Sequence, residues 1–344
     1  MSARRPARIL QVIASSRGGG AVHVRELARR LDPAAYAVTV AMPEDGGTVG
    51  AADFEAAGVG FLPLPIAAGA SAQALIALRR AMQQSDLVHL HGARAALFGR
   101  LAAASIRKRP AIVYTVHGYA APYYLPLRRR LQIGLERALA PLADCTLAVS
   151  QAERSALVDS GVFAPERVTV VWNGVDVEAF AAPPFAPDPQ QGRAAWRAAL
   201  GIPPTARLAT TACRLYKPRD FSTLIAAFAQ ARQACPDAHL LIVGDGPDRP
   251  AVEALVARHD LAAAVTLTGW RTDLSAVYAA SDLYTLTTWG WEGLPLTVLE
   301  AMAAGLPVVG TRAGGFAEAV VENVTGILAE RRNVASLADA LLRL

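Results

Sequence analysis

Lysine is almost missing from this chain of 344 residues, in which Lys108 and Lys217 are the only two among 34 basic residues. The formal charge of +5 therefore comes almost entirely from arginine, a usage typical of a high-GC genome. Cysteine is also scarce. Cys145, Cys213 and Cys235 are scattered without the spacing of metal ligands, and their odd number argues against a disulfide framework. These absences favour a reducing, cytoplasmic environment.

Long hydrophobic runs are absent as well. No apolar stretch approaches the roughly 20 residues that span a bilayer, so the sequence does not predict an integral membrane protein. The apolar run 9–14 is too short for a signal peptide, and we interpret it as the first strand. With 53% hydrophobic residues, a chain of this length can bury two cores and suits two domains.

Two basic clusters, at 107–109 and 128–130, stand out from the general arginine content. Such short runs are usually solvated helix ends. The second cluster also permits a surface for anionic lipid, because aromatic and apolar residues precede it: Tyr119, Tyr123, Tyr124 and Leu125. Nucleic acid is not an expected partner, since neither a stacking motif nor a basic recognition helix accompanies the clusters.

Short β-branched runs alternate with longer amphipathic stretches, which predicts parallel sheets flanked by helices. The predicted strands are 8–15, 38–41, 61–64, 87–90, 111–116, 146–149, 168–171, 208–212, 240–243, 265–268, 283–286, 308–309 and 326–328. A proline-rich segment interrupts the alternation, and within it we expect a helix only at 193–200. The predicted organisation is an N-terminal domain at 1–178, a linker and entry helix at 179–204, and a C-terminal domain at 205–344.

Two glutamates eight positions apart, Glu292 and Glu300, flank a predicted junction between a loop and a helix. If the helix begins near Leu296, Glu292 faces a pocket and Glu300 lies one turn inside the helix. Backbone donors at a helix start favour an anion. A nucleotide-sugar, with hydroxyls at both ends and phosphate in the middle, fits all three features. Ordinary capping and dipole compensation would also place two glutamates here.

Ligands of such sheets bind beyond the carboxyl ends of the strands. Glycines and polar residues follow the predicted strands at several points: Gly18, Gly19 and Gly20; His89 and His91; His117 and Gly118; Asn173 and Gly174; Gly244, Asp245 and Gly246; and Gly269.

Together these loops resemble the retaining glycosyltransferase family 4, and the match runs over nearly the whole chain. Each motif is weak alone, but their joint order is specific: Gly18 to His23, His117-Gly118, Ser150, Asn173 to Asp176 with Phe180, Arg214-Leu215, Val243 to Pro247, Gly269, Asp273, Tyr278, Ser281-Asp282, Glu292 to Glu300, and Gly314-Gly315 with Glu318. The resemblance implies an α/β GT-B fold, in which two Rossmann-like doubly wound parallel-sheet domains face a cleft.

The resemblance also implies roles for the motif residues. Glu300 would hold the donor ribose, Glu292 would contact the transferred sugar, and Arg214 and Arg219 would neutralise the diphosphate. We therefore expect Glu292, His117, Arg214 and Arg219 to be catalytic. The remaining donor-site candidates are Gly19, Gly20, Gly244, Gly269, Leu294, Leu296 and Thr297.

The acceptor side is expected in the N-terminal half. The resemblance places His117 beside the transferred sugar as a hydrogen-bond donor, although a core histidine capping a strand is an alternative. Further acceptor-side candidates are His23, His91, Tyr119 and Asn173, of which the two histidines could instead be structural.

Two positions depart from the family pattern, because Cys213 replaces the usual glycine and Arg219 the usual lysine. Lys217 lies two residues out of register. Since arginine keeps the charge, we expect altered donor affinity rather than loss of function. No Asp-x-Asp motif or metal-spaced cluster is evident, so we expect no cofactor and no metal. A retaining, front-face displacement follows from the resemblance alone.

The expected partners are a nucleotide-sugar donor and a lipid-linked saccharide or related glycan acceptor. The segment 114–119 and the cluster 128–130 are similar to family members that extend lipid-linked glycans of the bacterial envelope. This predicts a cytoplasmic protein at the inner face of the plasma membrane. The C-terminal helices look incomplete compared with the family. A donor-binding pseudo-transferase or partner subunit therefore remains an alternative, and an epimerase or phosphorylase is a third.

Overall fold

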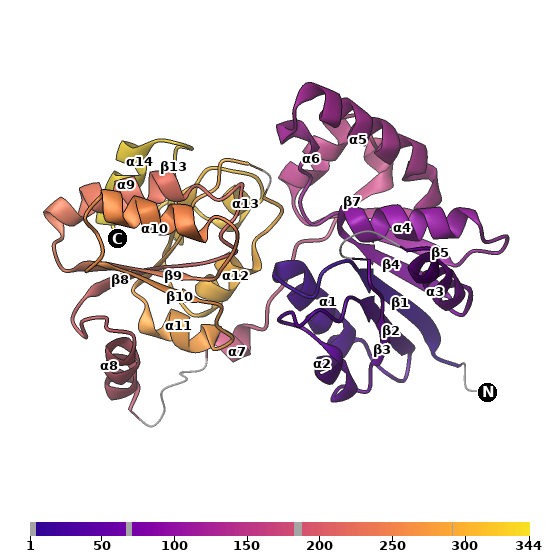
Figure 1. Cartoon of the computed structure of the whole chain (residues 1–344), viewed down its shortest axis with the longest axis horizontal. Helices are drawn as coiled ribbons and strands as arrows, with labels where there is room; N and C mark the ends of the chain where they lie inside the picture. The colour runs from indigo at the N-terminus through magenta and orange to yellow at the C-terminus, as the bar shows by residue number, and fades with distance from the viewer. Residues whose placement is uncertain (1–4, 67–70, 182–187, 291) are drawn as a thin grey trace. The chain divides into compact units, whose positions relative to one another are not determined.

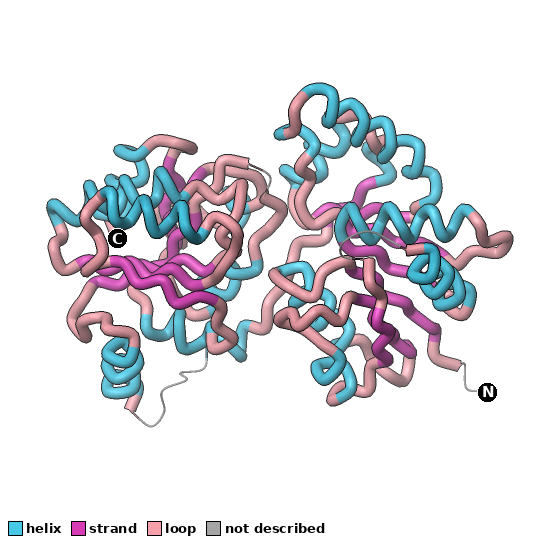
Figure 2. Tube along the Cα trace, in the orientation of Figure 1, coloured by secondary structure: helices cyan, strands magenta, loops and turns pink. Residues whose placement is uncertain are grey.

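The computed structural model describes residues 5–66, 71–181, 188–290 and 292–344. The chain divides into two compact units, Met1–Trp172 and Asn173–Leu344. Each unit has a parallel sheet with helices on both faces (Figure 1 and Figure 2). Both therefore have the predicted doubly wound architecture. Among the described residues, no helix combines the length and apolar character that crossing a bilayer requires.

The first unit contains seven described strands in the order β3-β2-β1-β4-β5-β6-β7. They are β1 (Ala7–Ile13), β2 (Tyr36–Met42), β3 (Gly60–Pro63), β4 (Leu87–His91), β5 (Ala111–Thr115), β6 (Cys145–Ala148) and β7 (Val168–Val170). The order reverses between β1 and β4, whose crossover helices leave on opposite faces. A crevice beyond the carboxyl ends of β1 and β4 is the expected ligand position.

Helices cover both faces of this first sheet (Figure 1). They are α1 (Gly19–Arg30), α2 (Ala51–Glu55), α3 (Ala72–Gln83), α4 (Gly92–Ala104), α5 (Pro126–Leu139) and α6 (Gln151–Asp159), with short 3-10 turns η1 (Ala121–Tyr123), η2 (Ala140–Leu142) and η3 (Pro165–Arg167). On one face α1 and α2 bury Val24 and Phe54 against β1 and β2. On the other, α3 and α4 bury Leu78 and Ala95 against the same strands and β4. Alternate residues of each strand supply the two cores.

The second unit contains six described strands in the order β10-β9-β8-β11-β12-β13. They are β8 (Arg207–Ala212), β9 (Ala238–Val243), β10 (Val265–Gly269), β11 (Leu283–Leu286), β12 (Val308–Thr311) and β13 (Gly326–Ala329). The helices are α7 (Val177–Ala181), α8 (Pro189–Ala199), α9 (Phe221–Ala234), α10 (Arg249–Arg258), α11 (Leu274–Ala280), α12 (Leu296–Ala303), α13 (Phe316–Ala319) and α14 (Val334–Leu342). This sheet reverses between β8 and β11, which places a second switch point there.

All the strands that the sequence predicts are present, and their ends agree with the prediction to within two residues. The prediction for the proline-rich segment is wrong in one respect, because α7 and α8 both form where only a helix at 193–200 was expected. Aspartates start both helices: Asp176 accepts from the Ala179 amide at 3.1 Å, and Asp188 accepts from the Gln191 amide at 3.0 Å. Positions 182–187 of the predicted linker lie outside the described residues.

Candidate active site

In the second unit, the loops that follow β8 and β11 run side by side at the switch point. The Asp220 amide donates to the Thr287 carbonyl at 3.1 Å, and the Trp289 amide donates to the Pro218 carbonyl at 3.1 Å. The Thr288 hydroxyl adds a bond to the same Pro218 carbonyl, also at 3.1 Å. These bonds join the loop that carries Arg219 to the loop that carries Glu292.

Arg219 and Glu292 form a two-point ion pair between these loops. Nη1 of Arg219 donates to Oε2 of Glu292, and Nη2 lies 3.4 Å from Oε1. Burial, the largest single influence, lowers the pKa of Arg219, but the charge of Glu292, its hydrogen bond and the neighbouring Cys213 and Tyr284 together raise that pKa above its ordinary value. Arg219 Nε is buried without a partner. The residue predicted to bind the diphosphate and the residue predicted to contact the sugar are thus in contact with each other in the structure.

Glu300 lies where the sequence predicts it, one turn inside α12, which begins at Leu296. Its side chain is buried, and the Tyr278 hydroxyl donates to its Oε2 at 2.8 Å. Burial and the Glu300 carboxylate raise the pKa of Tyr278 well above its ordinary value, so the hydroxyl keeps its proton. Tyr278 therefore fixes the orientation of the Glu300 carboxylate.

The first turn of α12 also holds Thr297, whose Oγ1 lies 2.8 Å from the Tyr284 hydroxyl. That hydroxyl is 3.1 Å from the carbonyl of Ala212 at the end of β8, so the helix start is tied to the sheet. Pro295 provides no side-chain cap for α12, so the first-turn amides are not capped by a side chain. Such amides point out of the start of a helix and can bind an anion.

Close backbone approaches explain the glycines of the site. A Cβ on Gly244 would lie 2.0 Å from the Cys213 carbonyl oxygen, and one on Gly314 would lie 2.2 Å from that of Glu292. Both glycines have positive φ, as does Gly269, whose carbonyl accepts from the Gly244 amide at 2.8 Å. These contacts hold the Arg219 and Glu292 loops against neighbouring turns.

The other donor-site candidates surround these loops. Arg214 is exposed, with its guanidinium 4.7 Å from the Tyr216 ring centre, whereas Leu294 and Leu296 are buried. Asn173, predicted on the acceptor side, instead lies with the Glu292 loop, because its Nδ2 donates to the Leu294 carbonyl at 2.7 Å. Asn173 Oδ1 is buried without a partner.

In the first unit, the predicted glycine turn and histidines meet at the other switch point. Gly18 caps α1 with φ of 80°, and Gly19 and Gly20 are the first helical residues. His91 is the last residue of β4, and His117 follows β5 with φ of 57°. His23 from α1 completes the group, with its ring centre 4.8 Å from that of His117.

The histidines are linked by hydrogen bonds. His91 Nδ1 lies 3.0 Å from His117 Nε2, and His91 Nε2 lies 2.5 Å from Oε1 of Gln11 in β1. His89 has a separate partner, Thr115 Oγ1, at 2.7 Å. Burial lowers the pKa of all four histidines, to about 4 for His89, so their rings are neutral at pH 7.

Glu153 holds the loop after β5 in place. Its buried carboxyl accepts from the Val149 amide at 2.8 Å and from the Gly118 amide, next to His117. No role for Glu153 was predicted from the sequence, although Ser150 and Glu153 have the Ser-x-x-Glu spacing of a capping box. In the structure, Ser150 Oγ accepts from the Glu153 amide at 3.1 Å. That spacing was the available signal.

Tyr119 does not lie on the surface, where the predicted lipid-binding patch next to residues 128–130 would place it. Its side chain is only 7% exposed, and its hydroxyl donates to Ser160 Oγ at 3.0 Å. The ring packs in the core of the first unit because the loop turns inward after Gly118. Tyr123 and Leu125 remain exposed.

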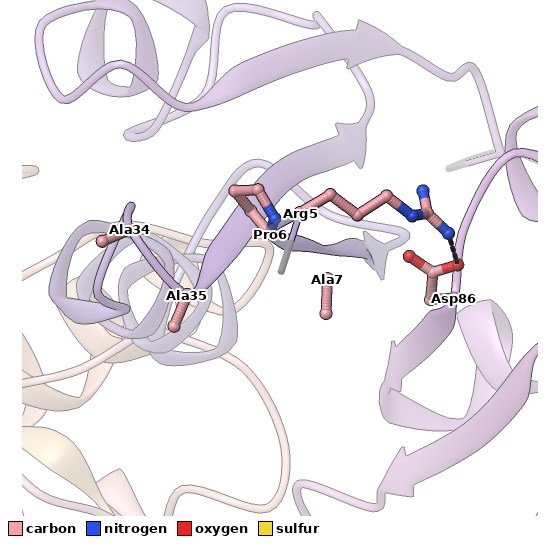
Figure 3. Close-up of a pocket in the computed structure, with 6 residues that line it drawn as sticks. All are labelled: Arg5, Pro6, Ala7, Ala34, Ala35 and Asp86. Carbon is pink, nitrogen blue, oxygen red and sulfur yellow. Dashed lines mark hydrogen bonds and ion pairs between the residues drawn. The ribbon is translucent and has the colours of Figure 1, made fainter. Parts of the chain in front are cut away.

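A surface pocket is lined by Arg5, Pro6, Ala7, Ala34, Ala35 and Asp86 (Figure 3). It lies at the amino ends of β1, β2 and β4, opposite the end where such sheets bind ligands. Asp86 is already paired, with Arg5 at 3.0 Å and with the Arg8 amide at 2.9 Å. This pocket is therefore not the candidate site.

Two different protein families match the two parts of the chain. Residues 17–179 match the family described as Glycosyltransferase Family 4, and residues 206–344 match the family described as Glycosyl transferases group 1. The chain is similar in structure to HepE of Anabaena, solved in complex with UDP and glucose, with a TM-score of 0.82 and 23% identity. That match covers 98% of this chain and 89% of HepE.

Two relatives illustrate the range of acceptors. The chain is 27% identical over 279 residues to UDP-Gal:alpha-D-GlcNAc-diphosphoundecaprenol alpha-1,3-galactosyltransferase of Escherichia coli, covering 79% of this chain and 70% of that enzyme. It is 31% identical over 283 residues to D-inositol 3-phosphate glycosyltransferase of Salinispora arenicola, covering 77% of this chain and 62% of the relative. The chain thus spans roughly two thirds of the length of these relatives.

Proposed function

The chain belongs to glycosyltransferase family 4 and has the predicted GT-B fold, and we propose that it transfers a sugar, with retention, from a nucleotide-diphosphate donor to a lipid-linked saccharide. The observation that carries this proposal is the convergence of Arg219, Glu292 and Glu300 around the start of α12. Arg219 and the helix amides suit the diphosphate of a nucleotide-sugar, Glu300 suits its ribose, and Glu292 suits the sugar that is transferred.

Donor binding would rearrange the Arg219 and Glu292 pair. A diphosphate offers Arg219 a doubly charged partner, and guanidinium binds phosphate oxygens at two points. Glu292, released from Arg219, can then accept hydrogen bonds from hydroxyls of the transferred sugar. Exposed Arg214 provides a second cation for the phosphates.

The transfer step requires charge stabilisation on the departing diphosphate. The bond between the anomeric carbon and the phosphate oxygen breaks, the acceptor hydroxyl forms the new bond on the same face, and the diphosphate accepts the acceptor proton. Arg214, Arg219 and the α12 amides stabilise the negative charge that develops on the leaving group. We infer that these groups replace a divalent cation, so that transfer is metal-independent.

A UDP-sugar is the first donor to test, and a polyprenyl-diphosphate saccharide the first acceptor. The E. coli relative is named for a UDP-galactose donor and a diphosphoundecaprenol acceptor, and HepE was solved with UDP. A lipid-linked acceptor requires the enzyme to reach a membrane. An exposed leucine stripe on α5 supports such peripheral binding, with Leu127 72% and Leu131 67% exposed.

The deciding experiment measures nucleoside diphosphate release from UDP-, GDP- and ADP-sugars by the purified chain. Glu292→Gln keeps the size of the side chain and removes its charge, and Glu253→Gln, on the exposed face of α10, is the matched control. We expect release from one donor, lost in Glu292→Gln and kept in the control. Donor binding with no release, even with acceptor present, would instead identify a donor-binding partner subunit.

A further inference from the structure

We propose that His23, His91 and His117 form a binding site for a single transition-metal ion of the zinc class. The three side chains each offer one ring nitrogen, and these nitrogens all lie within 4.8 Å of one another. They come from α1, from the end of β4 and from the loop after β5, so the fold assembles the group. This explains why metal-ligand spacing along the chain did not reveal it.

Gln11 fixes the ring of His91 for metal binding. An amide oxygen can only accept, so His91 Nε2, 2.5 Å from Gln11 Oε1, carries the proton. The lone pair of His91 is therefore on Nδ1, which faces His117. A metal-bound histidine usually donates its second ring N–H to a carbonyl or carboxylate in this way. Gln11 is buried in β1 and already supplies that outer contact.

The spacing of the ligand atoms suits a tetrahedral ion. With metal-nitrogen bonds of about 2.0 to 2.1 Å, two ligands of a tetrahedral site lie about 3.3 Å apart. His91 Nδ1 and His117 Nε2 are 3.0 Å apart in the structure. For His117 Nε2 to bind an ion, the proton of this ring must first move from Nε2 to Nδ1. The ion then takes the place of the hydrogen bond between His91 and His117, and both rings stay neutral.

The third ligand and the open position lie toward solvent. His23 is partly exposed on α1, and its ring centre is 5.7 Å from that of His91. A rotation of the His23 side chain closes the group around an ion that enters from that side. His89 does not take part, because its Nε2 bonds to Thr115 Oγ1 at 2.7 Å. Three protein ligands leave a fourth position for water.

The ligand chemistry selects the ion. Three neutral imidazoles suit Zn²⁺, Cu²⁺, Ni²⁺ or Co²⁺, whereas Mg²⁺ and Ca²⁺ prefer oxygen ligands. The effect on catalysis rests on the proposed function and on the position that the family resemblance implies for His117, beside the transferred sugar. An ion on His117 Nε2 fixes that ring within the three-histidine group and occupies the space beside it, so we expect the ion to inhibit transfer. This is compatible with catalysis that needs no metal.

Metal binding is tested on the full chain, stripped with EDTA, dialysed and titrated with Co²⁺, whose visible absorption reports four-coordinate geometry. We expect one Co²⁺ per chain, displaced by one equivalent of Zn²⁺. His23→Gln and His91→Gln should lose the absorption, while His259→Gln, at the end of α10, should keep it. Circular dichroism checks that each variant is folded. Because His23 is partly exposed, His23→Gln is expected to disturb the core least.

Gln11→Leu tests the proposed outer contact. It leaves all three ligands in place, and we expect Co²⁺ affinity to fall by about 10–100-fold. The site is disproved if the wild-type chain gives no four-coordinate Co²⁺ spectrum, or if the spectrum persists in His23→Gln and His91→Gln.

A transferase assay then tests the inhibition separately. Added Zn²⁺ should stop the wild-type reaction, EDTA should restore it, and Gln11→Leu should require about 10–100-fold more Zn²⁺. An unaffected reaction at a Zn²⁺ level that saturates the Co²⁺-competition site would overturn the inhibitory role alone. A chain with no transferase activity but with stoichiometric Co²⁺ binding would refute the proposed function and leave the metal site established.

Discussion

At the scale of single residues, the pair formed by Arg219 and Glu292 links structure to chemistry. The two opposite charges lie in neighbouring, partly buried loops and neutralise each other. Removing either one leaves an uncompensated charge. In the proposed function, the same pair separates when a diphosphate and a sugar take its place. Donor affinity therefore depends on how easily the cation at position 219 leaves Glu292. An arginine, bound at two points, leaves less easily than a lysine.

Substitution of Arg219 tests this dependence. Arg219→Lys keeps the charge, and we expect kcat to be largely retained while KM for the donor changes. Arg219→Ala removes charge stabilisation of the leaving group, and kcat/KM should fall by about 10²- to 10³-fold. Lys217→Ala is the control, because this exposed cation lies two residues away. Equal losses in Lys217→Ala and Arg219→Ala would contradict a specific role for Arg219.

Glu153 gives a second prediction at this scale. Burial raises the pKa of its carboxyl to about 7, although backbone amides that donate to it act in the opposite direction. The unfolded carboxyl titrates near pH 4.3, so the folded chain holds this proton more tightly between about pH 4.3 and 7. The resulting stability is complete below that range and is lost as pH rises through 7, by about 4 kcal/mol.

Glu153→Gln removes this titration and keeps the shape of the side chain. We expect the wild type to lose stability relative to Glu153→Gln as the pH rises from 5 to 8. Urea denaturation at several pH values, followed by circular dichroism, measures the difference in the free energy of unfolding. A difference that stays constant with pH would show that Glu153 does not titrate in this range.

At the scale of elements, α5 is amphipathic in an unusual sense, because its outer face is apolar. Its inner face is held by a buried ion pair, in which Arg100 Nη2 of α4 donates to Glu136 Oε2 at 2.7 Å. Leu127, Leu131 and Leu135 follow each other at four-residue intervals on the exposed face. The arginines at 128–130 adjoin this stripe, and all are exposed. Leucines flanked by arginines suit an anionic lipid surface.

Binding to vesicles of anionic phospholipid tests the role of α5. Each basic residue near such a surface contributes about 1 kcal/mol, so replacing Arg128, Arg129 and Arg130 with Glu should weaken binding by on the order of 100-fold or more. Leu127→Gln with Leu131→Gln should also weaken binding. The control is Arg107→Glu with Lys108→Glu, at a basic cluster outside α5, and vesicle sedimentation is the readout. Similar losses in all three variants would indicate non-specific charge attraction rather than docking through α5.

At the scale of the whole molecule, the six described strands of the second sheet follow the same order as the first six of the first sheet, and each sheet reverses after its third strand in that order. Each reversal brings together loops that are far apart in sequence. In the second unit this gathers arginines and carboxylates, and in the first it gathers histidines. The positive charge near the candidate donor site is therefore supplied by the chain itself.

Removal of metal tests this conclusion on the intact enzyme. We expect transferase activity to persist after EDTA treatment, because in the proposed function Arg214 and Arg219 supply the charge that a divalent ion provides elsewhere. Activity that EDTA abolishes and Mn²⁺ restores would contradict metal independence. Parallel assays with and without Zn²⁺ would distinguish this outcome from occupation of the histidine site.

The sequence predicted the strands and the start of α12 well, because hydrophobic periodicity and turn residues are local signals. It also predicted that Glu292 and Glu300 would lie at a loop and inside a helix. It missed α7, whose short length gives little periodicity, and it missed the contacts that depend on the fold. The bond between Asn173 and Leu294 joins residues 121 positions apart, and no local pattern predicts it. The inward turn of Tyr119 likewise follows from packing rather than from composition.

The separation of the cores has a consequence for how such chains diversify. Each hydrophobic cluster draws its residues from one unit alone. A genetic exchange that replaced one half with that of a relative would leave the buried residues of the other half with their original neighbours. With the acceptor expected on the first unit and the nucleotide-sugar on the second, selection could therefore change the molecule that receives the sugar without rebuilding the donor half, and new linkages could arise by recombination as well as by gradual substitution.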